Sequence, residues 1–328
     1  MIVLTQIPDL PTNVAWLDCA TNDDASILFA TCWNGTTPYV CSLYRRKENV
    51  WTAVLSNISI GFTPSLQIVC DNSGKYALFS TGSQIYVSSD YGDNFSLSTL
   101  PVVARTVVGI CIGGTPESKG YYFYATVSSD AGFYVLKSKN LALSWSIVYT
   151  DSDVIWRIAA AKNTGYVYTF TTNETNGFYT SFLISTDYGV KWTSAENQLF
   201  GEPRRVLTNN DGRIVTYNFY GEYGLIPFYS NNYLQTYKTV KDAQGKPIST
   251  ENYTPIFLSN SGKEFYCVNK YDGETGQIYK GKDTTVTKLS DQNMTWSCLC
   301  ASELSDPNSS QTYLAGTVDN GVWIYTTN

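Results

Sequence analysis

Two turn signals recur along this chain at one common interval. The first is an eight-residue turn closed by an aromatic residue, and the intervals between those aromatics are 44, 50, 47 and 45 residues, at Trp51, Phe95, Trp145, Trp192 and Tyr237. The second is a turn that ends in glycine, with intervals of 46, 45, 47 and 50 residues, at Gly74, Gly120, Gly165, Gly212 and Gly262. Because both signals stay in phase, the chain is built from repeats of one supersecondary unit.

Each repeat predicts four short strands. In the fourth repeat these cover residues 156–161, 166–171 and 181–184, with a last strand that begins at Trp192. The apolar runs are rich in β-branched and aromatic residues and are too short for helices. The chain of 328 residues therefore divides into seven units of about 47 residues.

The two ends of the chain predict how the repeats close. Residues 321–325 match the third strand of a repeat, and residues 2–7 can supply the missing fourth strand. Sharing one sheet between the termini leaves no open edge. We therefore predict a single all-β domain over residues 1–328, a seven-bladed β-propeller of four-stranded antiparallel blades. The expected blades are about 12–56, 63–101, 103–151, 154–197, 203–243, 253–290, and 294–328 with 1–8. Two separate domains are the less favoured alternative, because neither half closes alone.

The clearest turn has the pattern S-x-D-x-G-x-x-W at residues 185–192, and residues 88–95 repeat it with Phe in place of Trp. The Asp carboxylate can accept hydrogen bonds from backbone N–H groups of its own turn, and Gly supplies a positive φ. Residues 138–145 and 230–237 are degenerate copies. We call these four segments the box turns. The fixed positions of the pattern, to which we assign a structural role, are in the two full copies Ser88, Asp90, Gly92, Phe95, Ser185, Asp187, Gly189 and Trp192.

The pattern resembles the Asp-box of the bacterial neuraminidase repeat, which occurs in sialidases and sortilin-type receptors. This resemblance implies a propeller whose boxes hold blades together away from any active site. Sialidases open with Phe/Tyr-Arg-Ile-Pro, whereas the first repeat here begins at Asn13 without Arg, and Trp156-Arg157-Ile158-Ala159 lacks Pro. A sialidase-like glycoside hydrolase, with Glu202 and either Tyr149 or Asp153, is the alternative to a non-enzymatic role.

Composition removes several functional classes. The chain has no His, which excludes a Ser-His-Asp triad, a Cys-His pair and a His-ligated metal. Its 22 Lys and Arg against 28 Asp and Glu give a net charge of −6, which argues against nucleic acid. The eight Cys lie in strand-like runs without a Cys-x-x-Cys pair, so we expect buried free thiols and no metal or cofactor.

The expected setting is an assembly. The N-terminal segment carries no basic region before an apolar core, and no apolar run reaches the roughly 18 residues of a membrane span, so we expect cytoplasmic synthesis without membrane insertion. Low charge, no His and 26 Tyr resemble virion and phage structural components. We therefore expect a structural or interaction propeller, which binds a protein or a glycan through exposed tyrosines or loops.

One group of cations is a candidate ligand site. Arg105, Arg157 and the pair Arg204 and Arg205 open the first strands of the third, fourth and fifth repeats. First strands line the channel of a propeller, so these guanidinium groups, with Glu202 beside them, are expected to converge at the channel mouth. Such a group suits a carboxylate, phosphate or sulfate. The alternative is that each Arg pairs with a neighbour such as Asp153 or Glu202.

Overall fold

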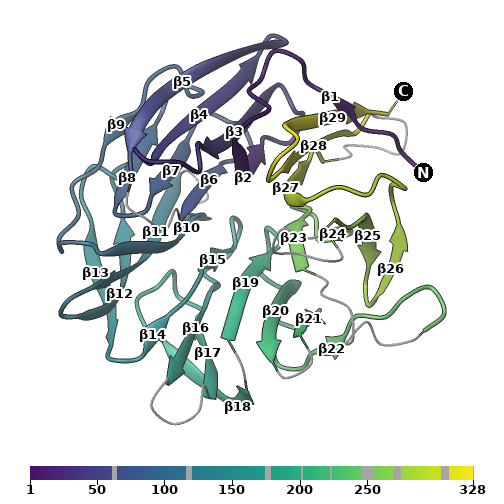
Figure 1. The fold of residues 1–328 in the computed structure, drawn as a ribbon. Coiled ribbons are helices and arrows are strands. Elements are labelled where there is room, and N and C mark those ends of the chain that lie inside the picture. Colours follow the sequence, from purple (N-terminus) through teal and green to yellow (C-terminus); the bar gives the residue numbers. More distant parts are fainter. Residues whose placement is uncertain are drawn as a thin grey trace.

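The computed structural model of the chain describes residues 1–60, 65–115, 120–173, 179–200, 202–221, 224–245, 254–268, 275–303 and 310–327. These residues form seven antiparallel sheets, and no helix occurs among them. The sheets stand around a central axis, which confirms the predicted all-β, seven-bladed propeller (Figure 1). Within the described ranges no helix is long and apolar enough to cross a membrane.

Each blade has four strand positions that run outward from the axis. The first strands surround the centre (Figure 1): β2 (Ala15–Thr21), β6 (Leu66–Cys70), β10 (Thr106–Gly114), β14 (Val154–Ile155) with β15 (Ala159–Ala160), β19 (Glu202–Thr208), β23 (Thr254–Leu258) and β27 (Trp296–Ala301). The second strands are β3 (Ile27–Trp33), β7 (Ala77–Thr81), β11 (Tyr121–Ser129), β16 (Val167–Asn173), β20 (Val215–Gly221), β24 (Phe265–Val268) and β28 (Thr312–Thr317).

The two outer positions complete the sheets. The third strands are β4 (Val40–Lys47), β8 (Gln84–Ser88), β12 (Gly132–Ser138), β17 (Tyr179–Ser185), β21 (Gly224–Ser230), β25 (Ile278–Lys282) and β29 (Val322–Thr326). The fourth strands are β5 (Val50–Ser59), β9 (Ser96–Leu97), β13 (Ser146–Asp151), β18 (Thr193–Phe200), β22 (Lys238–Thr239), β26 (Thr285–Lys288) and β1 (Thr5–Gln6). We number the blades in chain order, from blade 1 (β2–β5) to blade 7 (β27–β29 with β1).

The N-terminal strand closes the ring as predicted. Strand β1 pairs antiparallel with β29, in the register Thr5 to Ile324 and Gln6 to Trp323. The Ile7 N–H donates to the Val322 carbonyl at 2.8 Å, and Leu4 beside the strand is 1% exposed. Both termini therefore lie at blade 7 (Figure 1).

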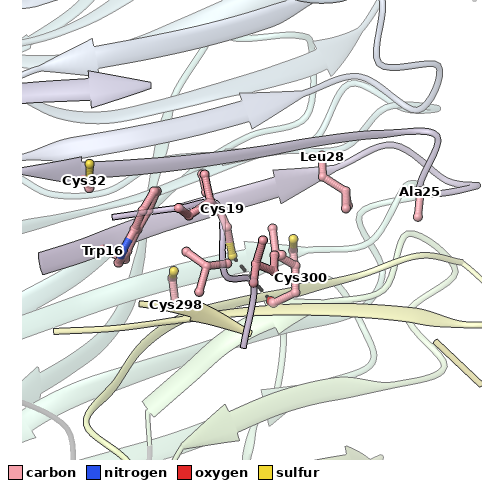
Figure 2. Packing of buried hydrophobic residues seen from close by; sticks show 12 residues of the cluster. Trp16, Cys19, Ala25, Leu28, Cys32, Cys298 and Cys300 are labelled. Atoms are coloured by element: carbon pink, nitrogen blue, oxygen red, sulfur yellow. Dashed lines mark hydrogen bonds between the residues drawn. The ribbon is translucent and has the colours of Figure 1, made fainter. Parts of the chain in front are cut away.

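The hydrophobic core consists of layers between neighbouring blades. Figure 2 shows the layer in which Trp16 and Cys19 of blade 1 pack with Cys298 and Cys300 of blade 7. All eight cysteines are free and buried, as the sequence predicted. Burial in strands of this kind suits thiols, which behave as small apolar side chains.

The box turns have the hydrogen bonds expected of them. Ser185 Oγ donates to Asp187 Oδ1 at 2.9 Å, and Asp187 Oδ1 accepts from the Lys191 N–H at 2.8 Å. The degenerate turns keep this arrangement with Asn in place of Asp, because Asn140 Oδ1 accepts from the Ser144 N–H at 3.1 Å. An amide oxygen accepts the same turn N–H groups as a carboxylate does. The box aromatics differ slightly from expectation, since they lie one residue before the fourth strand rather than in it.

Each full box turn contacts the preceding blade. A Cβ added to Gly92 would lie 2.6 Å from Cε1 of Phe29 in blade 1, so only glycine permits this approach. In blade 4, the Tyr188 carbonyl accepts a hydrogen bond from Tyr124 Oη in blade 3 at 3.0 Å. The box turns therefore both close their own hairpins and tie neighbouring blades together.

Candidate functional site: the central channel

A cavity of about 200 Å³ occupies the centre of the propeller. Its walls come from the first strands and the turns after them, and its polar lining includes Asp18, Gln67, Arg157, Lys162, Arg205 and Asn260. Ligand sites are typically concave clefts of this kind, in which a few polar side chains converge from several elements. We call the part around Arg157 and Arg205 the arginine end.

Irregularities in two first strands position the arginines of the arginine end. In blade 5 the pairing register shifts between Pro203 and Arg205, and the Arg205 N–H donates to Asn218 Oδ1 at 3.0 Å. In blade 4 the first strand is interrupted between β14 and β15, where Thr169 Oγ1 donates to the Arg157 carbonyl at 2.9 Å. A bulge redirects the side chains next to it. Both arginines that line the cavity lie in or directly after such an irregularity.

Asp18 lies opposite these arginines, on strand β2 of blade 1. It also follows a bulge, between Trp16 and Asp18. Its Oδ2 accepts from the Ile68 N–H at 3.0 Å, and its Oδ1 is 4.0 Å from Arg205 Nη2. Burial raises the pKa of Asp18 above 3.8, and it outweighs the opposite effects of Arg205, the Ile68 N–H and Arg157. Among the described residues, the arginine end therefore brings together Arg157, Arg205 and a carboxyl group, Asp18, whose ionised form is disfavoured by burial.

The turns between first and second strands surround the other end of the cavity. Backbone hydrogen bonds join them from blade to blade: Glu303 N–H to the Asp23 carbonyl, Asp23 N–H to the Asn72 carbonyl, Asn163 N–H to the Asn210 carbonyl, and Asn210 N–H to the Asn260 carbonyl, at 2.7 to 3.0 Å. We call these linked turns the turn ring. Such bonds fix the positions of its side chains relative to one another.

Four side chains from different blades meet inside the turn ring, and we call them the polar hub: Asp23, Asn72, Lys162 and Asn260. Lys162 Nζ donates to Asn72 Oδ1 and, at 3.2 Å, to Asn260 Oδ1. Asn260 Nδ2 donates to Asp23 Oδ1 at 2.5 Å. The hub therefore places an amine, two carboxamides and a carboxyl group in contact.

The predicted arginine site is assembled only in part. Arg157 and Arg205 line the cavity, whereas Arg105 does not: its Nε lies 3.4 Å from Asp130 Oδ1, and its side chain is 70% exposed. Arg105 directly precedes β10, before the bulge of that strand between Val107 and Gly109, so it is not at the position that faces the channel. The side chains of Glu202 and Arg204 lie outside the described part of the structure.

Tyr149 and Asp153, the two residues proposed as partners of Glu202 in a glycoside hydrolase, lie outside the central cavity. Tyr149 Oη donates to Asp151 Oδ2 at 2.8 Å, and Asp153 Oδ1 accepts from Asn173 Nδ2 at 3.2 Å. Neither Tyr149 nor Asp153 lines the central cavity. Within the described ranges no group of three or more Cys, Asp or Glu side chains could hold a metal ion.

Sequence reasoning missed Asp18, Gln67 and Lys162. One signal was present for Asp18, which is a charged residue within the otherwise apolar run 14–20 of a first strand. Gln67 joins two blades, because its Nε2 donates to the Val108 carbonyl at 2.9 Å. Lys162 directly precedes a turn, where a cation is ordinarily solvated, so nothing in the sequence marked it as part of a central cluster.

Comparisons with known proteins agree on the fold. No protein-family model matches the chain, and no curated protein matches its sequence. Hydrazine synthase of Kuenenia stuttgartiensis contains a chain with a TM-score of 0.64 and 12% identity, over 100% of this chain and 99% of that one. The β-propeller domain of the Trilobed protease from Pyrococcus furiosus has a TM-score of 0.61 and 9% identity, over 96% and 95%. Identities this low establish the β-propeller fold alone.

Proposed function

We propose that this chain is a non-enzymatic interaction propeller that binds one carboxylate of a partner protein at the arginine end of its channel. The observation that carries the proposal is the position of Arg157 and Arg205. They come from neighbouring blades and line the same cavity. Guanidinium groups bind carboxylates through charge-assisted hydrogen bonds, which are strongest where water is partly excluded.

The chemistry at this end suits an anionic guest. Among the described lining residues, Arg157 and Arg205 lie at the same end of the cavity as Asp18, and burial raises the pKa of that carboxyl group. A guest carboxylate therefore competes with a weakened internal one. The side chain of Arg205 is only 13% exposed, so a group that reaches it is largely desolvated.

Glycoside hydrolysis has less support. That reaction needs two carboxyl groups flanking one bond, about 5 to 10 Å apart. Among the described lining residues, Asp18 is the carboxyl group beside the arginines, whereas Asp23 and Glu303 belong to the turn ring. Glycan binding rests on exposed tyrosines alone, and no described tyrosine lines the cavity.

We also propose that the blades belong to the Asp-box class and that the chain serves as an assembly component, for example of a virus particle. The support for the first is the shared hydrogen bonding of the four box turns. The support for the assembly role is the composition of the chain and the closed ring of blades. A closed propeller offers a stable platform for adaptable loops.

Calorimetric titration with a single-carboxylate probe tests the binding site. The probe is the N-acetyl amide of glutamate, and the matching glutamine compound has the same shape without the charge. We expect the glutamate compound to bind, and Arg157→Ala to weaken it by roughly tenfold, about 1.4 kcal/mol. Arg105→Ala removes the same charge at an exposed site and should leave the affinity unchanged. Equal binding of both compounds, or equal loss in both variants, would refute the site.

A further inference from the structure

The polar hub brings together the three groups that an amide-exchange reaction needs: an amine, a carboxamide and a carboxyl group that can transfer a proton. Lys162 Nζ lies 3.2 Å from the carboxamide oxygen of Asn260. The nitrogen of that same carboxamide donates to Asp23 Oδ1 at 2.5 Å. The amine thus contacts the carbonyl, and the acid contacts the leaving nitrogen. We propose that Lys162 and Asn260 join in an intramolecular isopeptide bond, with Asp23 as the group that transfers the proton.

The turn ring holds the three groups in place. Asp23 N–H donates to the Asn72 carbonyl at 3.0 Å, and Asn210 N–H donates to the Asn260 carbonyl at 2.8 Å. Asn163, next to Lys162, donates its N–H to the Asn210 carbonyl at 2.7 Å. Because the backbone is already fixed on each blade, little entropy is lost when the groups react.

Burial shifts the pKa values of Lys162 and Asp23 toward the protonation states that the reaction needs. Burial lowers the pKa of Lys162, against the opposing effects of Cys70, Asp23, Asp71 and Glu303. Burial raises the pKa of Asp23, and Lys162 and the Asn260 hydrogen bond oppose that rise. Desolvation thus favours an amine with a free electron pair and a carboxyl group that keeps its proton.

The chemistry balances without an oxidant or a cofactor. The lone pair of Lys162 Nζ attacks Cγ of Asn260, a C–N bond forms, and the carbonyl electrons move to Oδ1. Asp23 gives its proton to Nδ2 and takes one from the attacking nitrogen. When the carbonyl re-forms, the bond from Cγ to Nδ2 breaks and ammonia leaves. Asp23 ends in its starting form.

The structure also provides an exit for the ammonia that the reaction releases. A second cavity of about 320 Å³ borders the turn ring, and Asp23 and Asn260 line it together with Asn163 and Glu303. Ammonia can leave by this route.

Asn72 also accepts a hydrogen bond from Lys162, so two carboxamides contact this amine. Asp23, however, accepts from Nδ2 of Asn260, so Asn260 is the carboxamide whose nitrogen receives the proton.

Mass spectrometry of the full chain tests the bond. We expect the intact protein to be about 17 Da lighter than its sequence, the mass of one ammonia, and a digest to contain a branched peptide that joins Lys162 to Asn260. The branched peptide separates this crosslink from a cyclised asparagine of equal mass change.

Variants assign the roles. Asp23→Asn keeps an acceptor for Asn260 but cannot transfer the proton, so it should fold and retain the full mass. Asp211→Asn removes an exposed carboxylate from the neighbouring turn and should still lose ammonia. Circular dichroism shows whether each variant is folded. A wild-type protein of full mass, a crosslink at Asn72, or a crosslink that survives in Asp23→Asn would overturn the proposal.

Discussion

Arg205 of blade 5 and Asp18 of blade 1 face each other across the channel, with 4.0 Å between Nη2 and Oδ1. These blades are not neighbours in the ring, so the contact spans the cavity itself. The separation lies at the outer limit of an ion pair, so a guest carboxylate can take the place of Asp18 beside Arg205. The same contact makes Asp18 an internal competitor for any anion that enters.

Asp18→Asn should therefore strengthen binding of the glutamate probe. Near neutral pH we expect a gain of roughly tenfold, about 1.4 kcal/mol, because the competing charge is gone. Burial raises the pKa of Asp18 above 3.8, so in the wild type the affinity for the ionised probe should rise as the pH falls through that raised value, once the titration of the probe's own carboxyl group, at about 4.3, is taken into account. Titrations at several pH values check this. The variant should lose most of the pH dependence, and an unchanged profile would show that Asp18 does not compete.

Asp187→Ala should loosen the box turn of blade 4. Burial raises the pKa of Asp187, but hydrogen bonds from the Lys191 N–H, Ser185 Oγ and the Val190 N–H outweigh it, and the net pKa lies below 3.8. Its stabilisation is therefore present above pH 3.8 and is lost as the pH falls through the lowered value.

In denaturant unfolding near neutral pH, Asp187→Ala should cost about 1–2 kcal/mol, as the loss of a capping side chain does. The difference from wild type should shrink in acid. Asp130→Ala, at a side chain that is 91% exposed, serves as the control and should change little. If the two substitutions lowered the free energy of unfolding equally, Asp187 would have no special structural role in the box turn.

Gly92→Ala tests the contact between box turn and preceding blade. The new Cβ would lie 2.6 Å from Cε1 of Phe29, at a φ of +76°. Gly82 has a φ of +58° and no atom within 4 Å of the added Cβ, so Gly82→Ala measures the backbone cost alone. We expect about 1 kcal/mol for Gly82→Ala and about 2–4 kcal/mol for Gly92→Ala, measured by thermal unfolding. Similar values would mean that the blade contact adds nothing.

Leu4→Ala tests ring closure. Leu4 is 1% exposed beside β1, whereas Val3 next to it is 69% exposed. We expect about 2–4 kcal/mol of destabilisation from Leu4→Ala and less than about 0.5 kcal/mol from Val3→Ala. Deletion of residues 1–8 should go further, since it exposes the edge of β29 and promotes aggregation. A truncated protein as soluble and stable as the full chain would contradict closure by β1.

The fold was predictable because its signals are local and repeated. The box turn at residues 185–192 and the glycine turn at Gly165 each form from a short stretch of sequence, and their period gives the number of blades. Closure by residues 2–7 followed from the same phase, because only one strand position was left empty at the C-terminal end.

The site was predictable only in part, because its residues come from separate blades. Whether an arginine faces the channel depends on local irregularities of the first strand, such as the β-bulge before Arg205, which no composition rule locates. Arg205 follows one and lines the cavity, whereas Arg105 directly precedes its strand and pairs with Asp130. Lys162 and Asn260 are 98 residues apart in sequence, and only the closed ring brings them together.

A crystal structure of the protein soaked with the N-acetyl amide of glutamate tests the proposed binding site most directly. We predict that the carboxylate occupies the central cavity, with its oxygens at about 2.7–2.9 Å from guanidinium nitrogens of Arg157 and Arg205. Density for the probe only on the outer surface, with Arg205 still beside Asp18 and no guest at the arginine end, would contradict the account.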